Sequence, residues 1–172
     1  IEPARVAVLR GRVLADNGAP LSGVRVSVHN HPEFGHTFSR SDGHYDLGIN
    51  GGAEVVLDFA LQDFLSAQRK ATVQWQRFEP VEDLVMVPLD PEVTIVDFVE
   101  PIEVAVGTEE TDDVGTRTAR LMLQQGTQAV ATLGDGTEVA LSSISVRATE
   151  FTVGENGLDR MPLQLPPNSG YT

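Results

Sequence analysis

Hydrophobic and polar residues alternate in short runs along most of this chain, and breaker residues separate the runs. At residues 24–28 the valines take every second position, with Arg25 and Ser27 between them. This alternation places the valines on one face of a strand that is buried on one side. Apolar positions at helical spacing are almost absent. The pattern therefore predicts an all-β protein.

The first half of the chain carries seven such runs. They predict strands at residues 5–14, 24–28, 36–39, 45–47, 53–61, 72–75 and 84–89. Ser41, Asp42 and Gly43 lie between the third and fourth runs, and an Asp-Gly pair at that place favours a tight hairpin turn because its backbone needs positive φ. Seven short strands separated by turns are typical of a sandwich or an open barrel.

A boundary between two modules is expected at residues 88–91, because two prolines within four residues interrupt strand hydrogen bonding. Beyond this boundary, strands are predicted at residues 93–98, 103–106, 118–123, 128–133, 137–141 and 145–153. Residues 161–172 are rich in breakers and predict an extended exit. We therefore expect two small β-sandwich modules in tandem, at residues 1–90 and 91–172.

The composition narrows the class of partner. The formal net charge of −13 repels nucleic acids and disfavours anionic lipid headgroups. The absence of cysteine excludes disulfides and thiolate metal sites. The chain begins at Ile1 without a signal peptide and has no apolar run of about 18 residues to span a bilayer. We interpret it as a fragment of a longer protein, with no binding of nucleic acid and no membrane insertion.

Three motifs of the first module carry a resemblance to a known family. They are RGRVL at residues 10–14, DNGAPLSGVRVSV at residues 16–28 and SDGHYDL at residues 41–47. In this order they resemble the carboxypeptidase-regulatory-like family, which implies a seven-stranded transthyretin-like (prealbumin-like) sandwich. The longer string at residues 23–52, with its HNHPEFG loop, resembles the version of this module in RHS/YD-repeat proteins and teneurins.

The second module resembles the same group through three phrases, RTARLMLQQGTQAV, SVRATEFTVG and LPPNSGYT. They are similar to the segment that follows this module in bacterial RHS-repeat proteins. The resemblance implies a structural role without catalysis, in which such modules brace or plug a large β-shell that is secreted or exposed at the cell surface. It also implies a bacterial source, and neighbouring domains of the same parent chain as partners.

Histidines of the first module are candidate ligands for a transition metal. Four of them fall within sixteen residues, and histidine is the commonest metal ligand in proteins. His29 and His31 are the metal candidates because they are two positions apart. Pro32 argues against a strand that would hold both side chains on one face. Structural loop histidines are therefore the alternative.

An acidic run in the second module offers candidate ligands for calcium. Glu109, Glu110, Asp112 and Asp113 supply carboxylate oxygens, which calcium prefers, and we predict that they lie on a loop. Asp112 and Asp113 are the preferred ligands. Their spacing is not that of an EF-hand, so a solvated loop without metal is the alternative. No cofactor is required on either interpretation.

Neither module offers a convincing catalytic constellation. Ser41, Asp42 and His44 supply the residue types of a nucleophile, an orienting carboxylate and a base. All three lie on one hairpin turn, however, where Asp42 is explained by its tolerance of positive φ. We therefore predict a protein that is not an enzyme.

Aromatic residues and the HNHPEFG loop supply the candidate contact residues, which are His31, Phe34 and Trp75. Most of the aromatic residues are expected in the core, and Trp75, which lies between two glutamines, is the one for which burial and exposure in an interface both stay open. We expect a non-catalytic docking module of a large exported RHS/YD-repeat, teneurin-like protein. The alternative is an extracellular adhesion module that binds a glycan or a surface protein, since sandwiches host many functions.

Overall fold

A computed structural model describes residues 1–112, 115–150 and 157–163 of the chain. The chain forms two compact units. The first contains Ile1–Pro88 together with the described C-terminal residues 157–163, and the second is Leu89–Thr152. Within the described residues, no helix is long and apolar enough to cross a membrane.

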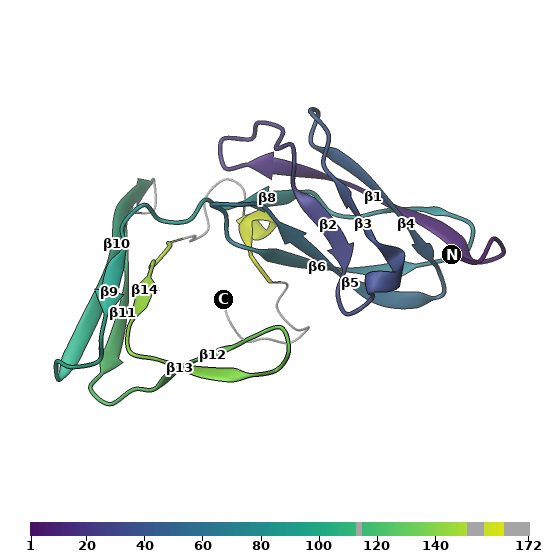
Figure 1. Ribbon diagram of the computed structural model, residues 1–172. Helices are drawn as coiled ribbons and strands as arrows, with labels where there is room; N and C mark the ends of the chain where they lie inside the picture. The colour runs from purple at the N-terminus through teal and green to yellow at the C-terminus, as the bar shows by residue number, and fades with distance from the viewer. Residues whose placement is uncertain (113–114, 151–156, 164–172) are drawn as a thin grey trace. The chain divides into compact units, whose positions relative to one another are not determined.

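The first unit consists of two four-stranded sheets (Figure 1). One sheet contains β1 (Val6–Ala15), β4 (His44–Asn50), β7 (Phe78–Pro80) and β8 (Leu84–Met86). The other contains β2 (Arg25–Val28), β3 (His36–Phe38), β5 (Ala53–Ala60) and β6 (Ala67–Val73). A 3-10 turn, η1 (Pro32–Phe34), follows β2. The predicted sandwich of the first module is confirmed.

Eight strands occupy only seven positions in this sandwich. Both β7 and β8 pair in parallel with β1, at Val8 opposite Phe78 and at Val13 opposite Leu84. They therefore lie one after the other along the same edge of β1. Pro80 ends the first of them, in keeping with the confinement of proline to strand edges. The predicted strand at residues 84–89 covers β8 only, and the sequence pattern did not predict β7.

The core lies between the two sheets and is built from alternate residues of each strand. The fully buried large side chains include Leu9, Val13, Val26, Tyr45, Ile49, Leu57 and Phe59. The Tyr45 and Phe59 rings belong to opposite sheets and meet edge to face, with centroids 5.6 Å apart. Burial of each such side chain contributes about 1.5–3 kcal/mol, so this one cluster dominates the stability of the unit.

The sixth strand differs from its prediction. The sequence places a strand at residues 72–75, whereas β6 is Ala67–Val73 and Trp75 follows it. Apolar alternation fails in this strand because Arg69 takes a core-facing position, opposite Leu57 of β5, and is only 2% exposed. A charged residue at a core-facing position breaks the alternation from which the strands were predicted, so the start of β6 was missed.

The second unit is also all-β, as predicted, and its strands form three separate antiparallel ladders. They are β9 (Thr94–Val96) with β14 (Ile144–Val146), β10 (Ile102–Asp112) with β11 (Gly115–Gln124), and β12 (Ala129–Thr132) with β13 (Glu138–Leu141). Each overlaps a predicted strand. The ladders are two-stranded and do not merge into larger sheets among residues 89–150.

The C-terminal described segment belongs with the first unit. It contains a second 3-10 turn, η2 (Gly157–Arg160), and the Gln68 N–H of β6 donates to the Pro162 carbonyl at 2.7 Å. The Arg160 guanidinium also pairs with Asp16 at 3.0 Å. The predicted division at residue 90 placed this segment in the second module. The second unit is instead an insertion, because the chain leaves the first unit and later returns to it.

Candidate interaction surfaces

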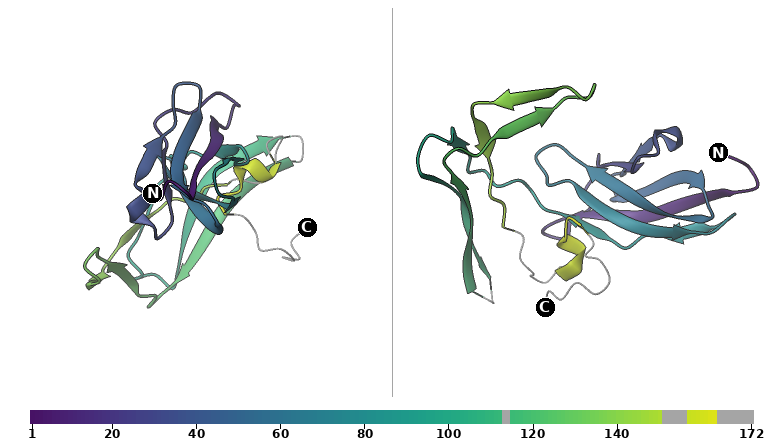
Figure 2. Two further views of the ribbon diagram at one scale, coloured as in Figure 1. Left: turned by 90° about the vertical axis from the view of Figure 1, so that its right-hand side faces the viewer. Right: turned by 90° about the horizontal axis from the view of Figure 1, so that it is seen from below.

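The β10–β11 hairpin carries an apolar stripe on one face. Ile102, Val104 and Val106 alternate along β10, and Met122 of β11 lies opposite Val104, so the four side chains share a face. Their exposed fractions are 58%, 41%, 40% and 72%. Figure 2 shows the hairpin as a long two-stranded ribbon. We call these four residues the apolar stripe.

The other ladders of the second unit are equally uncovered. Every residue of β13 is exposed, including Val139 and Leu141. Among the described residues of the second unit, the buried hydrophobic side chains are those of Val96 and Ala105. A two-stranded ladder without cover is at best marginally stable in water. The second unit is therefore short of the apolar contacts that a self-sufficient module needs.

The described part of the acidic run, Glu109, Glu110 and Asp112, lies in β10, so the prediction of a loop is wrong for these three residues. Glu109 and Glu110 belong to β10 and lie opposite Thr118 and Arg117 of β11. As neighbours in a strand, the two glutamates point to opposite faces of the ladder and cannot share a cation. Asp112 is the last residue of β10, and Asp113 lies outside the described residues.

The candidate histidines each contact a carboxylate of their own. His29 Nδ1 lies 2.9 Å from Asp58 Oδ2, and His31 Nδ1 lies 2.8 Å from Glu33 Oε1. The hydrogen bond from His31 lowers the pKa of Glu33. No three metal-binding side chains gather anywhere in the described part of the chain. The structure thus brings these two histidines to carboxylates rather than to a common centre.

The hairpin turn near His44 has the geometry of a turn rather than of a catalytic site. Asp42 Oδ1 accepts the His44 backbone N–H at 3.0 Å, and Gly43 has φ of 78°. This hydrogen bond lowers the pKa of the Asp42 carboxyl. The His44 ring Nδ1 lies 3.5 Å from the same carboxylate, beyond the usual length of a charge-assisted hydrogen bond. The Asp42 carboxylate therefore stabilises the backbone of the turn by accepting the His44 N–H.

The three candidate contact residues lie at different depths. His31 is exposed and its ring stacks at 5.7 Å on Phe34, which is itself partly buried against the core. Trp75 is 58% exposed. Its indole Nε1 lies close to Gly52, where an added Cβ would come within 2.2 Å of it, and the Arg5 guanidinium lies over the ring, 5.8 Å from its centroid. The Arg5 guanidinium therefore covers one face of the indole.

Phe78 is an exposed aromatic residue that the sequence pattern did not single out. It is 66% exposed, and the Arg10 guanidinium lies 5.0 Å from its ring centroid. An arginine over an aromatic face contributes about 0.5–1 kcal/mol at an exposed site. The stacked guanidinium also covers one face of this ring, as Arg5 does at Trp75.

Arg69 forms a site that the sequence analysis missed entirely. Its guanidinium donates to three carbonyl oxygens, those of Gln68 at 2.8 Å, Met161 at 2.7 Å and Asp159 at 2.8 Å. Burial lowers the pKa of Arg69, against the opposing influence of Asp159. No pattern in the sequence could reveal partners that lie about ninety residues away.

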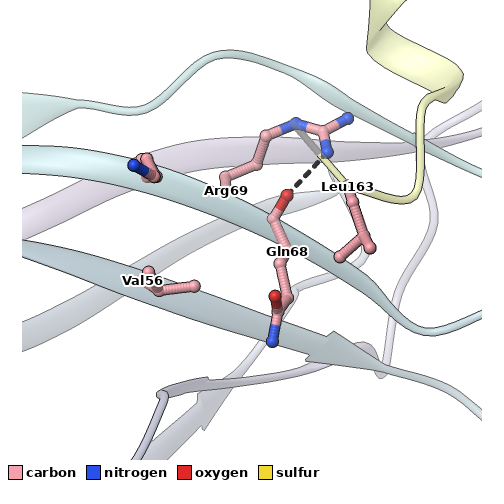
Figure 3. Close-up of a pocket in the computed structure, with 5 residues that line it drawn as sticks. Val56, Gln68, Arg69 and Leu163 are labelled. Carbon is pink, nitrogen blue, oxygen red and sulfur yellow. Dashed lines mark hydrogen bonds between the residues drawn. The ribbon is translucent and has the colours of Figure 1, made fainter. Parts of the chain in front are cut away.

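Around Arg69, the C-terminal segment closes one wall of a shallow pocket on β5 and β6. Val56, Gln68 and Leu163 line the pocket, as Figure 3 shows, and Lys70 lines it as well. The neighbouring depression contains His29 and Asp58. The pocket beside Leu163 is small and open, and its polar groups are already paired. We therefore interpret it as the place where the C-terminal segment packs on β5 and β6.

Comparisons with known proteins find relatives of this chain among the teneurins. Chicken (Gallus gallus) teneurin-1 is 40% identical over 103 residues, which is 58% of this chain and 4% of the relative. Mouse (Mus musculus) teneurin-3 is 32% identical over 150 residues, 84% of this chain and 6% of the relative. Teneurin-m of Drosophila melanogaster is 41% identical over 83 residues, 48% of this chain and 3% of the relative.

The chain thus spans only a small share of the length of these relatives. Its first 86 residues, which form nearly the whole of the two-sheet sandwich, match the family model described as "Teneurin TTR-like domain". That match covers half of the chain, and the chain belongs to the teneurin TTR-like domain family.

Proposed function

We propose that this chain is a non-catalytic docking module of a large extracellular protein, and that its second unit packs against other parts of that protein. The observation that carries the proposal is the apolar stripe on β10 and β11, together with a β13 that is exposed along its whole length. Exposed apolar side chains in a contiguous row mark contact surfaces. Covering them would supply the apolar contacts that two-stranded ladders lack.

The parent protein in this proposal is an exported, RHS/YD-repeat, teneurin-like chain of bacterial origin. The first unit serves as a stable base, since its core is complete. The second unit braces or plugs a large β-shell with its uncovered ladders. Partners are therefore neighbouring domains of the same chain, and the strongly negative net charge of −13 keeps nucleic acids away.

Adhesion to a glycan or a surface protein is the second candidate. The observation in its favour is the exposure of Trp75 and Phe78 on the first unit. Stacking of a sugar ring needs a free aromatic face, and the guanidinium groups of Arg5 and Arg10 already lie over the Trp75 and Phe78 rings. The aromatic residues therefore support a protein contact better than a glycan platform.

Hydrogen exchange on two proteins tests the docking proposal. One is this chain alone, and the other is the longer natural protein that contains it. Docking predicts that backbone amides of β10, β11, β12 and β13 exchange more slowly in the longer protein, because contacts cover these ladders. Equal exchange in both proteins would contradict the proposal.

Two double variants test whether the apolar stripe is the contact surface. The double variant Val104→Lys and Met122→Lys places two charges on the apolar stripe, and Ser142→Lys with Ser143→Lys adds the same charge at two exposed polar positions. In the longer protein, only the stripe variant should lose the extra protection. If both variants behave alike, the stripe is not the contact surface.

A further inference from the structure

Asp90 lies where the chain enters the second unit, and its carboxylate is almost fully buried. The residue is 7% exposed. Oδ2 accepts the Thr108 N–H at 2.7 Å, while Oδ1 accepts the Thr108 hydroxyl at 3.0 Å and the Glu92 N–H at 2.8 Å. Three donors thus surround one carboxylate. They join the entry of the unit to β10.

The backbone of Asp90 makes a second set of contacts, with the segment that leaves the unit. Its N–H donates to Thr149 Oγ1 at 3.0 Å. Its carbonyl accepts from the Arg147 guanidinium, which also reaches the Pro91 carbonyl at 3.2 Å. The entry and the exit of the second unit are therefore bound to each other through a single residue.

A bulge in β10 makes room for this arrangement. The register between β10 and β11 shifts between Val106 and Glu109, so Gly107 and Thr108 are left out of the ladder. A Cβ on Gly107 would lie 1.9 Å from the Ala148 carbonyl oxygen. Only glycine lets the exit segment pass this close, and the bulge turns both donors of Thr108 towards Asp90.

The exit segment is held at its next residues as well. Glu150 Oε1 lies 3.7 Å from Arg117 Nε of β11, and both side chains are largely buried, with exposed fractions of 12% and 26%. Arg147, Ala148, Thr149 and Glu150 in succession therefore contact Asp90, the bulge or β11. The segment is fixed to the base of the hairpin over four consecutive residues.

A turn aspartate alone would not need these contacts. Its usual role is to accept the N–H two residues ahead, as Asp90 does from Glu92. The other partners of Asp90 are 18, 57 and 59 positions away in the sequence. Contacts at such separations constrain the tertiary arrangement, which local turn formation does not require.

We propose that Asp90 is the positioning residue of the β10–β11 hairpin. It binds the hairpin to the segment that enters the second unit and to the segment that leaves it, so that the apolar stripe projects from a fixed base. This clamp joins the entry, the bulge and the exit into one body. Its role in presenting the stripe rests on the docking function proposed above. The clamp itself is testable on this chain alone.

Asp90→Asn is the first test, read out by hydrogen exchange of individual amides in the isolated chain. The amide group is nearly isosteric but presents an N–H₂ to the donors of Thr108. We expect the Thr108 amide and the amides of residues 147–150 to exchange about tenfold faster or more, as loss of hydrogen bonds to a charged group implies. Amides of β1 and β5 should stay unchanged.

Asp135→Asn is the matched control, because Asp135 accepts local hydrogen bonds from Thr137, whose N–H lies 2.9 Å away in the β12–β13 turn. It should leave Thr108 and residues 147–150 as they are. Thr108→Val removes only the hydroxyl donor of the clamp, and it serves as the milder test if Asp90→Asn unfolds the unit. We expect it to speed exchange at residues 147–150 by a smaller factor. Equal behaviour of all three variants would overturn the clamp.

The longer natural protein separates the two proposals. If Asp90→Asn removes the added protection of β10 and β11 there, while Asp135→Asn keeps it, the positioning role stands. If the unaltered longer protein shows no added protection, the docking function fails, and the exchange at residues 147–150 in the isolated chain still decides the clamp. If docking survives Asp90→Asn unchanged, the positioning role is wrong.

Discussion

Gly11 of β1 lies opposite Tyr45 of β4, and the tyrosine ring covers the place where a side chain on Gly11 would be. The two residues are paired in the ladder, and a Cβ on Gly11 would lie 2.5 Å from the Tyr45 hydroxyl oxygen. Tyr45 is fully buried and packs edge to face on Phe59. The glycine in the RGRVL motif is thus required by an aromatic ring on the next strand.

Gly11→Ala should destabilise the first unit. The added methyl group would displace the Tyr45 ring from a well-packed core, which costs about 1–3 kcal/mol. Chemical denaturation followed by circular dichroism measures the loss. Gly48→Ala is the control on the same sheet, since its Cβ would make only an ordinary 3.4 Å contact with Ile1, and it should cost no more than about 0.5 kcal/mol. Equal losses would mean that the ring does not depend on the glycine.

Tyr45→Phe should leave the first unit as stable as before or make it more stable. The Tyr45 hydroxyl is buried without a hydrogen-bond partner among the described residues, and its burial raises the pKa of the phenol. An unsatisfied buried polar group costs about 1–3 kcal/mol, and phenylalanine removes it while keeping the ring. A midpoint of denaturation clearly below that of the natural sequence would contradict this account.

Arg69→Leu should release the C-terminal segment and destabilise the first unit. It strips the partly buried carbonyls of Met161 and Asp159 of their donor, and each acceptor left unpaired costs at most about 1–3 kcal/mol. Limited proteolysis should then cut near residues 157–163. The neighbouring Lys70→Leu is the control, because its ion pair with Glu54 is exposed and contributes at most about 1 kcal/mol. Resistance of Arg69→Leu to proteolysis would show that the segment is held by other means.

Acid should loosen the base of the second unit through Asp90. Burial raises the pKa of this carboxyl, but hydrogen bonds from Thr108 and Glu92 and the charge of Arg147 more than offset it, so the net pKa is lowered. The stabilisation is thus fully present above the unfolded pKa of about 3.9 and is lost as the pH falls through the folded pKa. The Thr108 amide shift in an NMR titration should report a midpoint below about 3.9. A midpoint at or above the unfolded value would refute the hydrogen-bonded carboxylate.

Trp75 is the only tryptophan, so fluorescence reports directly on its surroundings. Acrylamide should quench the folded chain efficiently, because the indole is 58% exposed. Trp75→Phe should change stability by less than about 1 kcal/mol, since its main contact is with Arg5 at the surface. Addition of candidate glycans should leave the emission unchanged; a shift on glycan addition would favour the adhesion function instead.

Local patterns predicted the strands that obey them, and tertiary contacts explain the rest. The alternating valines of β2 and the Asp42 turn follow from side-chain period and backbone preference, so the sequence reveals both. The extent of β6 depends on Arg69, whose donors are satisfied only by a distant segment. The acidic run continues β10 because β11 offers a partner strand, and no property of Glu109 or Glu110 predicts that.

The candidate sites divide in the same way. Exposure of Trp75 was one of the outcomes that its glutamine neighbours allowed. Asp90, by contrast, reads as the centre of a proline-rich linker, and its partners Thr108 and Thr149 are common surface residues. Their meeting depends on a bulge and on the return of the chain, which a single sequence does not encode in any local window.

The return of the C-terminal segment to Arg69 has a consequence for the order of synthesis. Arg69 and the Met161 carbonyl are 92 positions apart, so at about 5–20 residues per second the ribosome makes the second roughly 5–20 s after the first. Throughout that interval the nascent sandwich holds a guanidinium whose final partners do not yet exist. The first unit therefore emerges before the second unit but is completed only after the second unit has been translated.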